Sequence, residues 1–186
     1  MRIFSKEIMG FKAIQNLFPK HVINKKNQHI NMKKLYTEEL KAIMQTNIDC
    51  SKMRLNRIEE IQKFAQGLNI KRIGIAHCIT FSNEARILST YLSEFFDVYT
   101  IDCKYGKITK KELLGGNGTR ILCNPVGQAE FLNEHNTELN ISMGLCVGHD
   151  MIFSKLSNGL VTNLFDKDFT NNNNPALTLI ELEQNN

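Results

Sequence analysis

The chain lacks any long hydrophobic run. No stretch approaches the roughly 20 apolar residues that a membrane-spanning helix needs, and the N-terminus has no apolar segment followed by a small-residue cleavage site. We therefore expect a cytoplasmic protein that has no membrane partner. Thiols in that compartment are reduced, and they serve as metal ligands or in catalysis more often than in structural disulfides.

The glycine-rich motifs that bind nucleotide phosphates are also missing. No G-x-G-x-x-G follows the first expected strand, where the sequence reads IAHCITFSNEA. The GGNG of residues 115–118 precedes an expected strand and lacks the lysine and hydroxyl of a P-loop. These absences argue against a dinucleotide cofactor.

The net charge of +4 is mild, and the N-terminal lysines lack the density and the arginines of a nucleic-acid-binding arm. We therefore expect no nucleic-acid partner.

The composition indicates one globular domain. Of the 186 residues, 42% are hydrophobic and 23% are charged, as in soluble proteins with a full core. Residues 1–31 are rich in Lys and Asn and show no clear periodicity, so we interpret them as a loose N-terminal extension. Residues 32–186 are expected to form a single α/β domain.

Apolar runs alternate with amphipathic helical segments over most of this domain. A helix with apolar residues at three- and four-residue spacing is expected over 55–68, and others over 83–96, 125–135 and 150–157. Strand–helix alternation predicts a mainly parallel sheet with helices on both faces. We expect a three-layer sandwich of the Rossmann-like or flavodoxin-like kind, with about five strands at 70–78, 98–103, 120–123, 139–146 and 160–165.

Four of the five cysteines share one position in this pattern, because each ends an expected strand. They are Cys78, Cys103, Cys123 and Cys146. The carboxyl ends of parallel strands lie along one edge of a sheet, where ligands bind. The pattern therefore predicts a shared metal, cluster or thiol site. The alternative is a purely structural role, in which these cysteines pack as small hydrophobes in the core. We assign no role to Cys50.

A metal site would use these four cysteines, with His149 as a reserve ligand. The spacing contains no C-x-x-C pair of the zinc-ribbon type. Four adjacent strand ends span about 14 Å, so two or three cysteines with His149 suit zinc, whereas an iron–sulfur cluster tolerates a wider spread. Zinc and an iron–sulfur cluster both stay open. Asn124 and Asp150 would orient the ligands.

A cysteine-dependent enzyme or thiol redox protein is the alternative interpretation. Cys123 and Cys146 each precede an expected helix, whose N-terminal amides favour a thiolate or an anionic ligand. Cys146 would then be the nucleophile and His149 the base, with Asp150 close by. A third possibility is a metal-free module that binds a small molecule in the same crevice.

Several blocks of the sequence resemble the DUF1847 family, which comprises uncharacterised prokaryotic proteins to which metal binding has been ascribed. The blocks are IGIAHCITFSNEA, CNPVGQAEFLNEHNTELNISMGLCVGHDMIFSK, VTNLFDKD and NNPAL, between about residues 55 and 179. The resemblance implies that all four strand-end cysteines occupy cysteine positions of the family. It also places further residues in motif positions: Asn124, Pro125, His149, Asp150, Lys167, Asp168, Asn174 and Pro175. The cysteine cluster that many members carry near the N-terminus is absent here, and the usual HNP reads NNP at residues 173–175.

Overall fold

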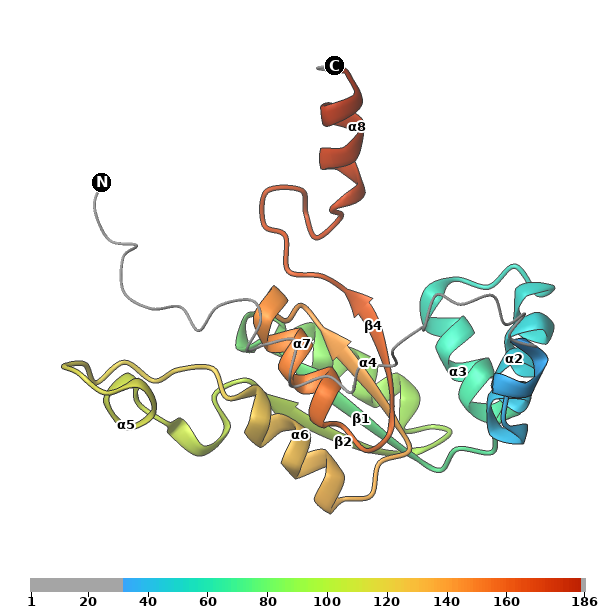
Figure 1. Ribbon diagram of the computed structural model, residues 1–186, viewed down its shortest axis with the longest axis horizontal. Coiled ribbons are helices and arrows are strands. Elements are labelled where there is room, and N and C mark those ends of the chain that lie inside the picture. Colours follow the sequence, from blue (N-terminus) through green and yellow to red (C-terminus); the bar gives the residue numbers. More distant parts are fainter. Residues whose placement is uncertain (1–31, 185–186) are drawn as a thin grey trace, which may run out of the picture. The chain divides into compact units, whose positions relative to one another are not determined.

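The computed structural model describes residues 32–184 (Figure 1). The expected loose extension, residues 1–31, lies outside these residues. The described residues divide into two units, residues 32–37 and residues 38–184. The described part of the first unit contains the 3-10 helix η1 (Met32–Leu35).

The second unit begins with two helices and then alternates strands with helices. Asn56 begins α3 through a capping box with Glu59, and Asn124 caps α6 with Pro125 in the first turn. The elements are α2 (Glu38–Ser51), α3 (Arg57–Gly67), β1 (Arg72–His77), η2 (Ile79–Phe81), α4 (Ser82–Leu92), β2 (Asp97–Asp102), η3 (Tyr105–Lys107), α5 (Lys110–Leu114), α6 (Pro125–Glu134), β3 (Leu139–Met143), α7 (Val147–Leu156), β4 (Leu160–Phe165) and α8 (Ala176–Gln184).

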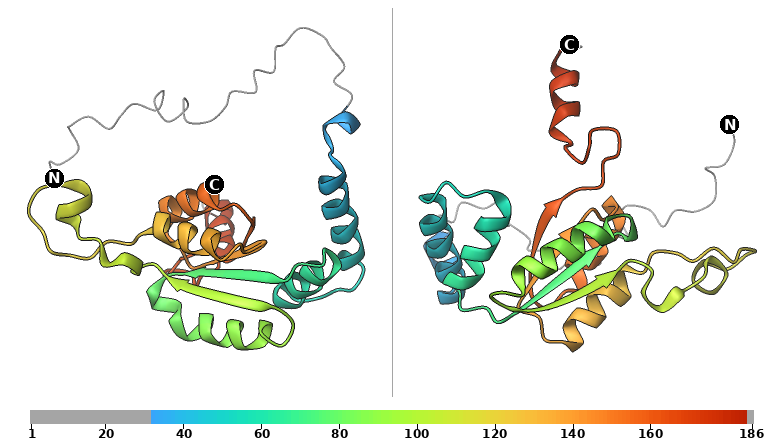
Figure 2. Two further views of the ribbon diagram at one scale, coloured as in Figure 1. Left: turned by 90° about the horizontal axis from the view of Figure 1, so that it is seen from below. Right: turned by 180° about the vertical axis from the view of Figure 1, so that it is seen from behind.

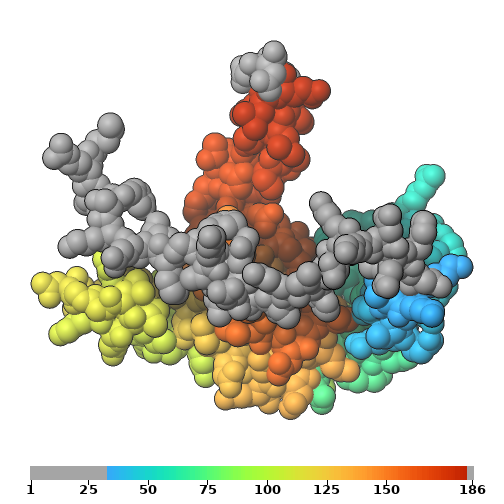
Figure 3. Space-filling model, viewed as in Figure 1, coloured from blue at the N-terminus to red at the C-terminus, as the bar shows by residue number. Residues whose placement is uncertain are grey.

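The strands form one parallel sheet in the order β2-β1-β3-β4. Helices cover both faces, with α4 on one side and α6 and α7 on the other (Figure 1 and Figure 2). The helices α6 and α7 lie side by side and form a continuous surface in the space-filling view (Figure 3). The α/β class and the parallel sheet are therefore confirmed.

The predicted number of strands was too high, because the structure has four strands and not about five. The segment 120–123 does not join the sheet. Its backbone instead pairs with the loop after β2: the Leu122 N–H donates to the Ile108 carbonyl at 2.9 Å, and Ile121 forms an isolated antiparallel bridge with Thr109. The hydrogen bonds that a sheet strand would have used are satisfied within this loop, so β2 stays at the edge of the sheet.

The two faces of the sheet have different cores. Large aliphatic side chains such as Ile73, Ile75 and Ile141 fill the face that packs against α3 and α4. The opposite face carries small residues at the centre of the sheet, which let α6 and α7 approach closely. At Gly74, an added Cβ would lie 2.2 Å from Asn140 Oδ1 and 2.7 Å from Leu132 Cδ1, so even one methyl group has no space there.

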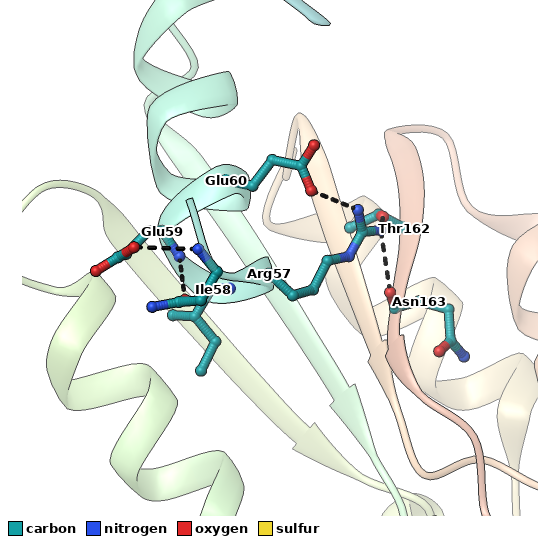
Figure 4. Close-up of polar contacts among 7 residues, drawn as sticks. Arg57, Ile58, Glu59, Glu60, Thr162 and Asn163 are labelled. Carbon is teal, nitrogen blue, oxygen red and sulfur yellow. Dashed lines mark hydrogen bonds and ion pairs between the residues drawn. The ribbon is translucent and has the colours of Figure 1, made fainter. Parts of the chain in front are cut away.

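Arg57 connects α3 to the edge strand β4 (Figure 4). Its guanidinium donates to Thr162 Oγ1 at 2.6 Å and to the Asn163 carbonyl at 3.3 Å, and it pairs with Glu60 at 3.0 Å. An edge strand presents unpaired carbonyls that favour pairing with other chains. Arg57 covers one of them.

None of the helices described has both the length and the hydropathy that a membrane-spanning helix requires.

Candidate functional site

The structure places the four predicted cysteines at or near the carboxyl-terminal end of the sheet. Cys78 directly follows β1 and Cys103 directly follows β2, so these two thiols come from neighbouring strands. Cys146 lies shortly after β3 as the residue that caps α7. Cys123 precedes Asn124, the cap of α6, although no sheet strand leads to it. The fold therefore gathers cysteines that are far apart in the sequence.

Cys78 is paired with a lysine from beyond the last strand. Lys167 Nζ lies 3.3 Å from Cys78 Sγ, and Thr80 Oγ1 lies 3.5 Å from the same sulfur. Burial opposes ionisation of this thiol, but the hydrogen bonds with Thr80 and the ammonium group of Lys167 outweigh it and lower the pKa of Cys78. The structure thus favours a thiolate at this position.

Lys167 interacts electrostatically with more than one sulfur. Burial alone would lower its pKa, yet the hydrogen bond with Cys78 and the nearby sulfurs of Cys78, Cys146 and Cys103 raise it. These thiols therefore lie within electrostatic range of one ammonium group. Lys167 Nζ also lies 4.9 Å from the centre of the Phe169 ring, which keeps the charge near the thiols by a cation–π contact.

Cys103 lies between two other thiols and is only 2% exposed. The Ile79 N–H donates to Cys103 Sγ at 3.4 Å. Burial raises the pKa of Cys103 to about 12, the hydrogen bond from Ile79 opposes this, and a side-chain hydrogen bond with Cys123 and the charges of Cys123 and Cys78 add to the rise. Cys103 therefore stays a protonated thiol near neutral pH.

Cys123 has a lysine partner of its own. Lys104 Nζ lies 3.5 Å from Cys123 Sγ and donates to the Ile121 carbonyl at 3.1 Å. The Asn124 N–H donates to the Cys103 carbonyl at 2.8 Å and so holds this segment beside the end of β2. The site thus contains two lysine–cysteine pairs on either side of the buried thiol of Cys103.

The start of α7 contributes His149 to the site. Burial lowers the pKa of His149, and the positive charges of Lys104 and Lys167 lower it further, so the ring is neutral near pH 7. The backbone N–H groups of His149 and Asp150 donate to the Cys146 carbonyl at 2.8 and 2.9 Å. Within residues 32–184, no hydrogen bond joins the Cys146 thiol to the His149 ring. The Cys146–His149 pair therefore stays a prediction.

The two residues expected to orient ligands have different surroundings. Asn124 Oδ1 accepts the Gly127 N–H at 2.9 Å and its Nδ2 donates to the Tyr105 carbonyl at 3.1 Å, so both ends of this side chain serve the helix cap. Asp150 Oδ1 is buried and has no hydrogen-bond partner among the described residues. Asn124 acts on the site by holding Cys123 in place, whereas Asp150 retains a free acceptor.

The arrangement does not form a ready-made coordination shell. In the described part of the chain, no group of three or more His, Cys, Asp or Glu side chains is arranged to hold a metal ion. Lysine ammonium groups contact two of the sulfurs instead. The predicted ligands therefore gather as a cluster of thiols and ammonium groups, in which a metal would have to displace the lysines.

The residue pattern does not single out Lys104, and it singles out Lys167 only as a motif position of the family. Each lies two residues after a strand, β2 and β4, so the reasoning that found the cysteines would also have found these lysines. Cys50, in contrast, lies in α2, where burial, Glu60 and Asp49 raise its pKa. We refer to the gathered residues as the thiol rim: Cys78, Cys103, Cys123, Cys146, Lys104, Lys167 and His149.

Comparisons with known proteins find relatives that have no assigned function. The family described as "Protein of unknown function (DUF1847)" matches residues 19–164. The uncharacterized protein MJ0455 of Methanocaldococcus jannaschii is 44% identical over 129 residues, which cover 67% of this chain and 66% of that protein. The match thus spans slightly less than two thirds of the relative's length. No solved structure matches the chain.

Proposed function

We propose that the thiol rim of this chain, which belongs to the DUF1847 family, binds and reacts with a small anionic molecule. The CNP and GLCVGHD blocks of the sequence predicted this family. The observation that carries this proposal is the 3.3 Å contact between Lys167 Nζ and Cys78 Sγ. An ammonium group at this distance stabilises the thiolate, which is the nucleophilic form of cysteine. Lys104 supplies a second positive charge for the ligand.

The topology supports a ligand site at this edge. In the order β2-β1-β3-β4, the chain leaves β1 toward one side of the sheet and later adds β3 on the other. We infer the flavodoxin-like variant of the doubly wound fold from this order, which is an argument by analogy. Ligands of such sheets bind beyond the carboxyl ends of the two strands at the switch point, where Cys78 and Cys146 lie.

In the proposed reaction, the residues of the thiol rim have separate roles. The two lysines bind the negative charge of the ligand, and the Cys78 thiolate attacks its electrophilic atom. Cys146 serves as a second nucleophile with the neutral His149 ring as its base. Reduced thiols of this kind suit a cytoplasmic protein.

Alkylation by two related reagents tests this proposal. Iodoacetate is an anion and iodoacetamide is neutral, so the ratio of their rates at each cysteine reports the local positive charge. We expect Cys78 to show the higher ratio and Cys50 the lower, when peptide mass spectrometry follows each site. Lys167→Gln should slow iodoacetate at Cys78 about tenfold, because it removes the ammonium group that attracts the anion and lowers the pKa of the thiol.

The matched control for this variant is Lys63→Gln, because Lys63 is an exposed lysine of α3 whose Nζ bonds to Gln66 at 3.3 Å. This control should leave the rate at Cys78 unchanged. Equal iodoacetate preference at Cys78 and Cys50 would contradict the proposal. So would a Lys63→Gln effect as large as that of Lys167→Gln.

Metal binding is the second candidate function. Its support is the electrostatic influence of Cys78 and Cys123 on Cys103, because all three are soft thiol ligands that come from separate segments of the chain. Zinc or an iron–sulfur cluster would be held by these thiols with Cys146, and with His149 in reserve. The bound group would supply Lewis acidity or electron transfer. The lysines would then stabilise the coordinated thiolates.

Anaerobic purification followed by metal and sulfide analysis tests the second candidate. Stoichiometric zinc, or iron with acid-labile sulfide, that disappears in Cys78→Ser and persists in Cys50→Ser would establish it. Metal-free protein with an alkylation pattern dominated by Cys78 would favour the thiol chemistry instead.

A further inference from the structure

We infer that Cys123 and Cys103 form a redox pair, in which the Cys123 thiolate reduces a hydroperoxide and the Cys103 thiol then closes a disulfide. This inference rests on the proposed thiol function and specifies an oxidant for the same site. It is carried by the juxtaposition of an accessible, lysine-paired thiol with a buried one.

The two cysteines differ in access. Cys123 is partly exposed and its Sγ lies 3.5 Å from Lys104 Nζ, so an oxidant from solvent reaches a sulfur that lies beside an ammonium group. Cys103 is 2% exposed and receives the Ile79 N–H at 3.4 Å. Cys123 therefore reacts first with the oxidant, because it is partly exposed and lies beside an ammonium group. Cys103 reacts in the second step, because it is buried.

The two sulfurs are close enough for a bond. The Cys123 side chain lies close enough to Cys103 to raise the pKa of that thiol. The backbone bond from the Asn124 N–H to the Cys103 carbonyl, at 2.8 Å, holds the two segments side by side as in a pair of strands. Paired backbones are about 4.8 Å apart, and disulfides join Cα atoms about 4.4–6.8 Å apart. Oxidation therefore requires little backbone movement.

The chemistry balances with a hydroperoxide as the oxidant. The Cys123 thiolate attacks the terminal oxygen of ROOH, an S–O bond forms, the O–O bond breaks, and the alkoxide takes a proton to leave as ROH. Cys123 is then a sulfenic acid. Cys103 attacks this sulfur, an S–S bond forms, and hydroxide leaves with the thiol proton as water. A low-molecular-weight thiol reverses the reaction by reducing the disulfide to two thiols.

Cys78 is a less suitable partner in this reaction. Lys167 and Thr80 already contact its sulfur. The rim therefore contains one lysine–cysteine pair for ligand capture and a second pair that ends in a disulfide. The disulfide would remove the negative charge beside Lys104 and so alter the charge that the ligand meets.

The experiment oxidises the reduced full chain with hydrogen peroxide and maps its products by peptide mass spectrometry without reduction. We expect a Cys103–Cys123 disulfide that dithiothreitol reverses. In Cys103→Ser, dimedone should trap a sulfenic acid at Cys123, whereas Cys50→Ser should form the disulfide at the normal rate. A Cys78–Cys103 disulfide, or random oxidation that includes Cys50, would overturn the inference.

Lysine variants supply a kinetic readout. Lys104→Gln should slow disulfide formation about tenfold, because it removes the charge beside Cys123. Lys104→Arg should restore the rate, and Lys107→Gln, an exposed lysine of the same loop, should leave it unchanged. Equal rates in all three variants would overturn the inference. An iodoacetate preference at Cys78 without peroxide-driven disulfide would refute the redox pair and leave the proposed function intact.

Discussion

The two ends of the sheet use charged groups in opposite ways. At the amino-terminal end, Glu138 Oε2 accepts the backbone N–H groups of Lys71 and Arg72 at 2.8 and 2.9 Å, and Arg72 Nε donates to the Asn136 carbonyl at 2.9 Å. These charges are satisfied by the backbone. At the carboxyl-terminal end, Lys104 and Lys167 contact sulfur atoms instead.

The charged groups at the two ends of the sheet therefore have different roles, one in folding and the other in reactivity. A carboxylate that accepts two backbone N–H groups joins segments of the chain and so stabilises the fold. A thiolate held by an ammonium group remains a nucleophile, because a ligand can share the ammonium. We therefore expect substitutions at the amino-terminal end to change folding, and substitutions in the thiol rim to change reactivity.

The largest effect is expected at Gly159, just before β4. A Cβ at this position would lie 2.6 Å from the Thr137 carbonyl oxygen and 3.0 Å from the backbone of Glu138. Backbone atoms have little freedom to move, so Gly159→Ala should lower the free energy of unfolding by about 2–3 kcal/mol. Urea denaturation measures this loss. A normal iodoacetate preference at Cys78 in the folded variant would support separate roles for the two ends of the sheet, and a lost preference would contradict them.

The next effect concerns the pH dependence of alkylation. The pKa of Cys78 is lowered mainly by Thr80 and Lys167 against the cost of burial, whereas burial raises the pKa of Cys50. The thiolate of Cys78 therefore persists to lower pH, and its iodoacetamide rate should exceed that of Cys50 by at least about tenfold at pH 7. Rates measured between pH 5 and 10 should give two separate midpoints. Coinciding midpoints would contradict the charge arrangement of the rim.

The smallest effect is expected at Glu138. Hydrogen bonds from the Arg72 and Lys71 N–H groups lower the pKa of this exposed carboxyl group, with burial opposing them slightly. Its contribution is present above the unfolded-state pKa and is lost as the pH falls through the folded-state pKa. Glu138→Gln should cost about 1 kcal/mol at pH 7 and less in acid. A cost that grows on acidification would show that Glu138 is not the stabilising anion.

Local patterns predicted most of the sheet. The apolar run 70–78 became β1, and the strand 160–165 has the bounds expected from its composition. The segment 120–123 shows where this reasoning fails. Its residues have strand propensity, yet its hydrogen bonds go to the loop after β2, because a four-residue segment takes the pairing that its neighbours offer.

Periodicity and strand length are local properties, so the order of the residues is enough to predict the alternation of strands and helices and the position of Cys78 and Cys103 at strand ends. The charge that each thiol meets depends on how the chain folds. Lys167 is 89 positions from Cys78 in the chain and 3.3 Å from it in space. The energy of an ion pair depends on distance and burial, and neither quantity is written in the order of the residues.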